Sequence, residues 1–149
     1  MITISTPEAM FQLGKDIGAQ LHTGDVLVLN GPLGAGKTLL TQGIGQALGI
    51  TGITSPTFVI SRIHKAGLAG IPLIHVDAYR LLLSENPIFS LDDLDLDSER
   101  EKAITVIEWG GELAARLSDE RLEIFIDRAK DVREIVAVGH GTRWNGFSL

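Results

Sequence analysis

The hydrophobic positions near the start of the chain have the spacing of an amphipathic helix. Four of them recur every three or four residues, namely Met10, Leu13, Ile17 and Leu21. Thr6 followed by Pro7 is typical of an N-cap and a first helical position, and Gly24 is placed to follow the last turn. We therefore predict a first helix between Thr6 and Gly24.

Beyond this helix, consecutive apolar residues predict strands. Residues 26–29 read Val-Leu-Val-Leu, as expected of a strand that is buried on both faces. A second helical spacing follows at Leu40, Ile44 and Leu48 and is expected to stop near Gly49. The first third of the chain is therefore predicted to run helix, strand, helix.

The rest of the chain predicts mostly β structure. Residues 57–63 and 72–77 are separated by a glycine-containing turn, so we expect an antiparallel hairpin. Residues 104–107 predict another buried strand, followed by a short helix over 113–117. An alternating segment at 122–127 and an apolar run at 135–138 predict an antiparallel section that closes the sheet.

Composition and charge limit the class of protein. The 149 residues are 44% hydrophobic, which suits one core, and we expect a single domain over 1–149. The absence of cysteine excludes a disulfide scaffold, a thiolate zinc site and thiol catalysis. No apolar run reaches the ~20 residues that span a bilayer, and residues 1–5 do not predict a signal peptide. We therefore expect a cytoplasmic protein with no membrane association.

A glycine-rich segment carries the main chemical signal. Residues 31–38 read Gly-Pro-Leu-Gly-Ala-Gly-Lys-Thr and match the phosphate-loop pattern G-x-x-x-x-G-K-S/T without a mismatch. The predicted strand before it and helix after it are the context that such a loop requires. Backbone N–H groups of the loop would bind phosphate, Lys37 would reach the β- and γ-phosphates, and the Thr38 hydroxyl would bind Mg²⁺. We therefore predict an α/β fold of the P-loop NTPase type, a three-layer sandwich with a mixed sheet.

Two carboxylates end predicted strands, as a magnesium–nucleotide site requires. Asp77 follows residues 73–76, and Glu108 follows residues 104–107. One could hold the metal and the other could orient the attacking water, and their spacing leaves open which does which. Residues 54–57, Thr-Ser-Pro-Thr, are either a switch near the γ-phosphate or an ordinary turn.

Several other patterns in the sequence say less about function. The acidic run at 93–97 lacks the glycine and the final glutamate of a calcium loop. His75 and Asp77 have no third metal ligand at a suitable spacing, and Trp109 and Trp144 are expected to anchor the core. The chain has no D-x-x-G or N-K-x-D pattern, which disfavours a GTPase. It also has no arginine-rich insertion, which disfavours a small-molecule kinase.

Taken together, these motifs resemble the TsaE (YjeE) family of bacterial P-loop ATPases. The resemblance lies in Gly-Ala-Gly-Lys-Thr at 34–38, Ser-Pro-Thr-Phe at 55–58, His-Val-Asp-Ala-Tyr-Arg-Leu at 75–81 and Glu-Trp at 108–109. It implies a weak ATPase that binds ATP with Mg²⁺ and docks on a TsaB–TsaD heterodimer. TsaD transfers a threonylcarbamoyl group to adenosine 37 of tRNA, and ATP hydrolysis supports turnover.

The resemblance also implies roles for individual residues. It implies that Thr38 and Glu108 bind magnesium, that Asp77 acts in hydrolysis and also lies at the metal, and that Lys37 is catalytic. The implied ATP-binding residues are Thr6, Leu33, Gly34, Ala35, Gly36, Lys37, Thr38, Leu39 and Arg133. The implied switch is Ser55, Pro56 and Thr57. Arg62 and Arg80 are candidates for an arginine finger in cis, and a partner could supply one in trans.

The net charge of −6 agrees with a protein that reaches tRNA only through its partners and does not bind DNA. A small phosphotransferase acting on an unidentified acceptor is the alternative enzyme, and a nucleotide-dependent binding module is the alternative without required hydrolysis.

Overall fold

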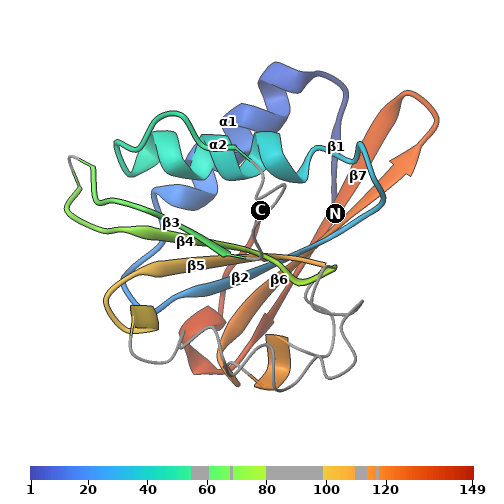
Figure 1. Ribbon diagram of the computed structural model, residues 1–149. Helices are drawn as coiled ribbons and strands as arrows, with labels where there is room; N and C mark the ends of the chain where they lie inside the picture. The colour runs from blue at the N-terminus through green and yellow to red at the C-terminus, as the bar shows by residue number, and fades with distance from the viewer. Residues whose placement is uncertain (55–60, 68, 80–98, 110–113, 117) are drawn as a thin grey trace.

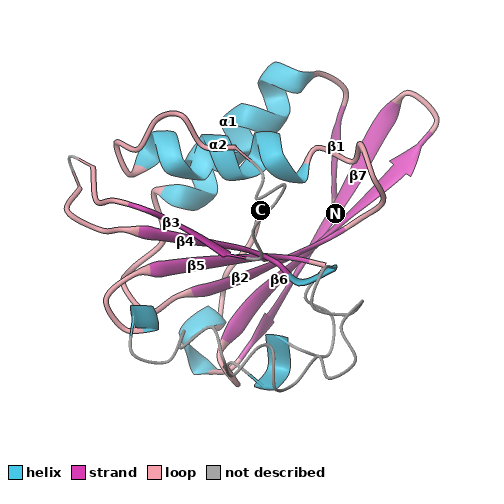
Figure 2. Cartoon of the chain, in the orientation of Figure 1, coloured by secondary structure: helices cyan, strands magenta, loops and turns pink. Residues whose placement is uncertain are grey.

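The computed structural model describes residues 1–54, 61–67, 69–79, 99–109, 114–116 and 118–149. These residues form a seven-stranded sheet with strand order β1-β7-β6-β2-β5-β4-β3. Two long helices pack together on one face of the sheet, and short helical turns lie on the other side (Figures 1 and 2). The predicted α/β class with a mixed sheet is confirmed.

The elements follow one another along the chain in an order close to the predicted one. They are β1 (Ile2–Ile4), α1 (Pro7–Gly18), β2 (Val26–Asn30), α2 (Lys37–Ala47), β3 (Ser61–His64), β4 (Leu73–Asp77), β5 (Ile104–Glu108), β6 (Arg121–Ala129), β7 (Val132–His140) and the 3₁₀ helix η1 (Thr142–Trp144).

The centre of the sheet is parallel and its edges are antiparallel. β2 pairs in parallel with both β5 and β6, and β4 pairs in parallel with β5. β3 pairs with β4, β7 with β6 and β1 with β7, all antiparallel. The continuous apolar runs of β2 and β5 are buried along their length, as central parallel strands require. The carboxyl ends of β2, β4 and β5 therefore meet at one edge of the sheet, where α/β folds bind ligands.

Helix α1 begins where the sequence predicts and ends earlier. The Thr6 side chain caps it by accepting a hydrogen bond from the Ala9 N–H (3.1 Å), and Pro7 is the first helical residue. The predicted end near Gly24 is wrong, because the helix stops at Gly18. Leu21 remains buried although it lies in the following turn, so an apolar position that continued the helical spacing belongs to a loop.

The two long helices touch through their backbones. A Cβ atom at Gly14 would collide with the carbonyl oxygen of Leu40, and one at Gly43 would collide with the carbonyl oxygen of Phe11. Only glycine permits this approach. The close crossing holds the N-terminal end of α1 near the loop between β2 and α2.

Most predicted strands are confirmed, with changes at their ends. β3 starts at Ser61, and residues 57–60 of the predicted strand lie outside the described residues. Residues 114–116 are helical, as predicted, whereas residues 113 and 117 of the same predicted helix lie outside the described residues. The sequence did not predict β1, a three-residue strand held by its pairing with β7. Among the described residues, no helix has the length and apolar character needed to cross a membrane.

Candidate active site

The loop from Gly31 to Gly36 links the carboxyl end of β2 to the start of α2. Gly36 is the N-cap residue, and its φ of 106° lies in the left-handed region that favours glycine. Gly36 brings no side chain to cap the helix, and the first turn of α2 contains no acidic residue. This leaves the positive end of the helix dipole and the loop N–H groups suited to an anion.

Lys37 is the first residue of α2 and its side chain is buried, with 6% of the residue exposed. Its ammonium donates hydrogen bonds to the carbonyl oxygens of Gly31 (2.7 Å) and Pro32 (2.9 Å). Burial lowers the pKa of Lys37, while the charges of Glu108 and Asp77 oppose that shift. Lys37 is therefore a desolvated cation that interacts electrostatically with both predicted carboxylates.

The two carboxylates lie at the ends of neighbouring strands. Asp77 is the register partner of Glu108 in the β4–β5 pair, so both belong to the same edge of the sheet. Glu108 is only 5% exposed, and its Oε1 lies 3.1 Å from Nε2 of His75. Asp77 Oδ1 accepts a hydrogen bond from the Tyr79 N–H (3.1 Å). The fold thus brings Lys37, Asp77 and Glu108 to one place, although 71 positions separate the first from the last.

Trp109 differs from its predicted role as a core anchor. It is half-buried, has a φ of 61°, and its ring lies over Lys37 with 4.0 Å between Nζ and the ring centroid. The Tyr79 ring is 5.5 Å away, so the two aromatic rings pack at the same site. Trp144, in contrast, is 4% exposed and lies in the core as predicted. The position of Trp109 directly after the carboxylate at the end of β5 was the signal available in the sequence.

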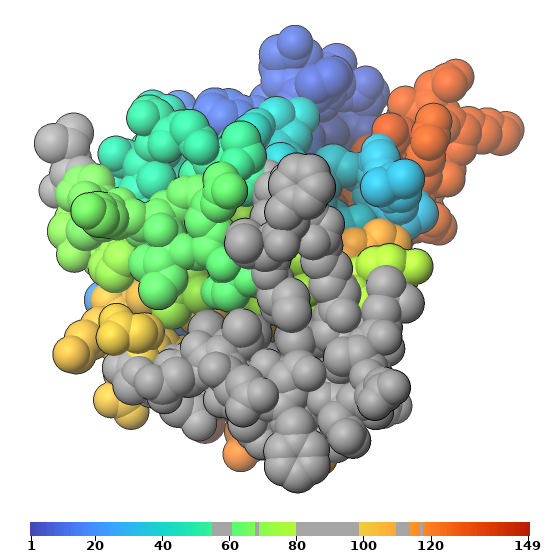
Figure 3. All heavy atoms as spheres, viewed as in Figure 1, coloured from blue at the N-terminus to red at the C-terminus, as the bar shows by residue number. Residues whose placement is uncertain are grey.

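A cavity of ≈ 300 Å³ lies between the loop and the N-terminal end of α1. Thr6 and Arg133 line it, and Arg133 Nη2 donates to the carbonyl oxygen of Gly34 (3.3 Å). The remaining lining residues are Ile4, Ser5, Pro7, Met10, Gly34, Ala35, Gly36, Leu39 and Asp131. Figure 3 shows the loop, the N-terminal residues and the tip of the β6–β7 hairpin on the same side of the molecule.

The other predicted site residues fall into three groups. Thr38 is half-buried in the first turn of α2, and Leu33 is 88% exposed at the tip of the loop. The predicted switch, Ser55, Pro56 and Thr57, and the candidate finger Arg80 lie outside the described residues. Arg62, the other candidate, donates from Nη1 to the hydroxyl of Thr54 (2.8 Å).

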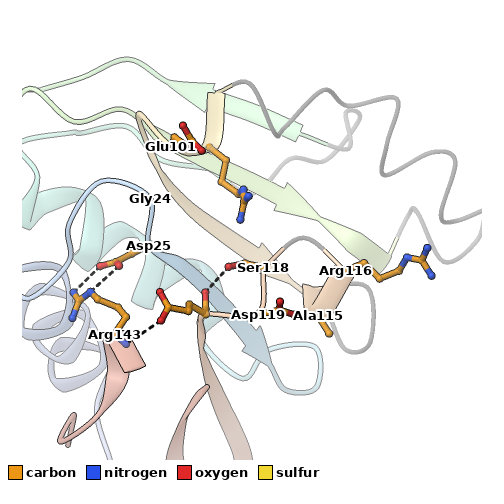
Figure 4. Close-up of a pocket in the computed structure, with 10 residues that line it drawn as sticks. Gly24, Asp25, Glu101, Ala115, Arg116, Ser118, Asp119 and Arg143 are labelled. Carbon is orange, nitrogen blue, oxygen red and sulfur yellow. Dashed lines mark hydrogen bonds and ion pairs between the residues drawn. The ribbon is translucent and has the colours of Figure 1, made fainter. Parts of the chain in front are cut away.

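A second, larger cavity of ≈ 440 Å³ lies near the amino ends of the parallel strands (Figure 4). Three of its charged residues, Asp25, Glu120 and Arg143, already have hydrogen-bond partners. Arg143 donates to both carboxylate oxygens of Asp25, from Nε at 2.9 Å and from Nη2 at 2.8 Å. The Glu120 carboxylate accepts from the Thr142 hydroxyl (2.9 Å) and from the Arg143 N–H (3.3 Å). Size alone therefore does not identify the binding site.

In the described part of the chain, no three His, Asp or Glu side chains are grouped so that they could hold a metal by themselves. The oxygen donors at the loop are of the type that Mg²⁺ prefers, and Mg²⁺ in nucleotide sites completes its coordination with phosphate oxygens and water. The donor set thus fits a magnesium ion that arrives with a nucleotide.

Comparison with known proteins agrees with this geometry. A family model described as "Threonylcarbamoyl adenosine biosynthesis protein TsaE" matches residues 4–135. The chain belongs to the TsaE family. The matched segment includes the loop, both carboxylates and all six predicted ATP-binding residues that line the smaller cavity, namely Thr6, Gly34, Ala35, Gly36, Leu39 and Arg133.

Relatives named "tRNA threonylcarbamoyladenosine biosynthesis protein TsaE" are similar over most of the chain. The Streptomyces coelicolor protein is 44% identical over 141 residues, covering 91% of this chain and 93% of that protein. The Mycobacterium tuberculosis H37Rv protein is 48% identical over 130 residues, covering 85% and 77%. The Bacillus subtilis protein is 39% identical over 141 residues, covering 93% and 84%.

The fold is also similar to that of a solved structure. The crystal structure of Bacillus subtilis YdiB superimposes with a TM-score of 0.75 at 34% sequence identity, covering 97% of this chain and 87% of that one. The TsaE resemblance seen in the sequence motifs is therefore confirmed at the level of both family and fold.

Proposed function

We propose that this chain is a magnesium-dependent ATPase that supports the formation of threonylcarbamoyladenosine in tRNA. The observation that carries the proposal is the meeting of Lys37, Asp77 and Glu108 at a phosphate loop. The family to which the chain belongs is named for this tRNA modification. We place the activity in one cytoplasmic domain formed by the described sheet and helices.

The loop would bind the triphosphate of ATP. Its N–H groups and the N-terminus of α2 favour anions, and Lys37 would exchange its two carbonyl acceptors for phosphate oxygens. Because the side chain is already desolvated, its charge would act strongly on the β- and γ-phosphates. The smaller cavity, with Thr6 and Arg133, would take the nucleoside end of the same ligand.

Thr38 and Glu108 would hold Mg²⁺, with Asp77 close to the metal and the attacking water. Bound there, Mg²⁺ would neutralise charge that develops on the phosphate oxygens. Asp77 is anchored by the Tyr79 N–H through one oxygen, and we propose that its carboxylate orients water for hydrolysis. The segment Ser55–Thr57 would respond to the γ-phosphate, as the family resemblance implies.

We further propose that the chain acts on a TsaB–TsaD complex and reaches tRNA only through it. The net charge of −6 supports an indirect role, because a protein that grips nucleic acid by itself usually has a basic surface. We also expect slow turnover by the chain alone, because Arg133, which donates to the loop at Gly34, lies at the cavity proposed for the nucleoside and so would not act as an arginine finger on the γ-phosphate.

ATPase assays with and without TsaB and TsaD test this proposal. We expect slow Mg²⁺-dependent hydrolysis by the chain alone and a higher rate when both partners are added. Asp77→Asn and Glu108→Gln should lower both rates by at least about 100-fold, as loss of a group that acts in the transition state does. The proposal would be contradicted if the chain hydrolysed no ATP with or without TsaB and TsaD, or if adding both partners left its rate unchanged.

A further inference from the structure

His75 is an exception in an otherwise aliphatic buried strand. Its neighbours in β4, Leu73, Ile74 and Val76, are all fully buried, and so is the imidazole. A buried polar ring costs free energy unless its hydrogen-bonding groups are satisfied. The position therefore calls for a reason other than packing.

That reason lies on the neighbouring strand. His75 is the register partner of Val106, so Glu108 is the diagonal residue two positions further along the same face of β5. Diagonal neighbours are within reach of long side chains. The result is the 3.1 Å contact between His75 Nε2 and Glu108 Oε1, in which both side chains are almost completely buried.

The two ring nitrogens of His75 have different surroundings. Nδ1 is buried and has no hydrogen-bond partner among the described residues. An ionised carboxylate can only accept, and a neutral imidazole has one N–H. The contact with Glu108 therefore requires a proton on Nε2, while Nδ1 is left without a partner. His75 therefore makes its hydrogen bond to Glu108, while its other ring nitrogen makes none among the described residues.

We propose that His75 is a positioning residue for Glu108. Its Nε2–H holds Oε1, so the carboxylate is fixed in place before a metal binds, and Oε2 remains available as a ligand. Hydrogen bonds of this kind orient metal ligands, and their loss typically weakens metal affinity by about 10- to 100-fold. This inference rests on the proposed function, because it assumes that Glu108 binds Mg²⁺.

Two amide substitutions separate this role from a structural one. Gln can place its side-chain N–H near the position of the histidine Nε2, whereas the shorter Asn cannot reach Glu108. His75→Gln should therefore keep the contact. His75→Asn should lose it and melt at a lower temperature, because its buried amide is left without a partner. Val106→Ala, which removes packing beside His75 on the same face, is the control for a purely structural loss.

The measurement is the calorimetric affinity for ADP, once with Mg²⁺ and once with EDTA, together with a thermal melt of each variant. The ratio of the two affinities is the magnesium gain. We expect His75→Asn to lose about tenfold or more of that gain while its affinity in EDTA changes less than about twofold. His75→Gln should retain most of the gain, and Val106→Ala should melt lower with the full gain.

Two results would overturn the inference while leaving the proposed function in place. One is a full magnesium gain in His75→Asn, and the other is an equal loss of gain in Val106→Ala. A wild-type chain that binds no ADP under either condition would instead contradict the proposed function, and the role of His75 would fail with it.

Discussion

Buried charged side chains have different kinds of partner at the two ends of the central parallel strands. At the amino end, Asp25 and Arg143 form a two-point ion pair, and Arg143 also donates to the carbonyl oxygen of Gln20 (2.9 Å). At the carboxyl end, the ammonium of Lys37 is held by carbonyl oxygens and a ring. No carboxylate of the described residues forms an ion pair with it, although Asp77 and Glu108 contribute to its field.

We interpret this difference as that between a structural junction at the amino end and the proposed binding site at the carboxyl end. The larger cavity lies beside the paired charges of the amino end, where a ligand would have to compete with existing partners. The carboxyl end keeps a desolvated cation whose partners are neutral dipoles, and an anionic ligand can replace those dipoles with full charge. The state of charge pairing is therefore a better guide to function here than cavity size.

The largest expected effect comes from removing the unpaired cation. Lys37→Ala should weaken ATP binding by about 10- to 100-fold, the value of hydrogen bonds to a charged group. Folding stability should not fall, because the substitution removes a buried charge from a site that lowers its pKa. Titration calorimetry and thermal melts test both parts. The control is Lys65→Ala, at an exposed lysine, and equal ATP affinity in the two variants would contradict the assignment.

The reverse pattern is expected at the amino end. Arg143→Leu leaves the Asp25 carboxylate, which is 6% exposed, without its ion-pair partner. Because the arginine side chain is 29% exposed, we expect a loss of about 1–3 kcal/mol, below that of a fully buried pair. ATP affinity should stay within about twofold of wild type. Urea unfolding measures the first quantity, and a stable variant that no longer binds ATP would reverse the comparison.

A smaller effect is expected where the smaller cavity meets the loop. Arg133→Ala removes the donor to the Gly34 carbonyl oxygen, at the end proposed for the nucleoside. We expect about fivefold weaker binding of ATP, which corresponds to roughly 1 kcal/mol, and little change for inorganic triphosphate. Arg116→Ala, at an exposed arginine of the other end, should change neither affinity. Equal losses for ATP and triphosphate would instead assign Arg133 to the phosphates.

The smallest effect concerns pH at the amino end. The Thr142 hydroxyl, followed by the Arg143 N–H, lowers the pKa of Glu120 below its usual 4.5. A lowered carboxyl pKa stabilises the fold above that value, and the stabilisation is lost as pH falls through the folded-state pKa. Thr142→Val should therefore be less stable than wild type at pH 7, with a smaller difference at pH 3. Urea unfolding at both pH values gives the comparison, and an unchanged difference would show that the hydroxyl does not act on this pKa.

Local patterns in the sequence were enough to predict much of the fold and the centre of the site. The loop and Lys37 could be found because the phosphate-loop pattern lies within eight consecutive residues, and Asp77 and Glu108 could be found because each directly follows an apolar run. The end of α1 could not, because Leu21 is buried from a turn and not from a helix. β1 was missed because three residues form a strand only when β7 is beside them.

The features that escaped prediction are contacts between distant parts of the chain. Asp25 and Arg143 are 118 positions apart, and no local pattern relates them. His75 reaches Glu108 only through the register of β4 and β5. Trp109 was expected in the core, and only the left-handed turn after β5 brings its ring over Lys37. Pairing and register, which the sequence does not state, decide these contacts.

The location of bound nucleotide tests the comparison of the two ends most directly. A crystal structure of the chain with Mg²⁺ and a non-hydrolysable ATP analogue should show the phosphates within residues 31–38. It should also show the Lys37 ammonium moved from the carbonyl oxygens of Gly31 and Pro32 to the phosphates. A nucleotide bound beside Asp25 and Arg143, or a phosphate loop that holds nucleotide while Lys37 keeps both carbonyl contacts, would contradict it.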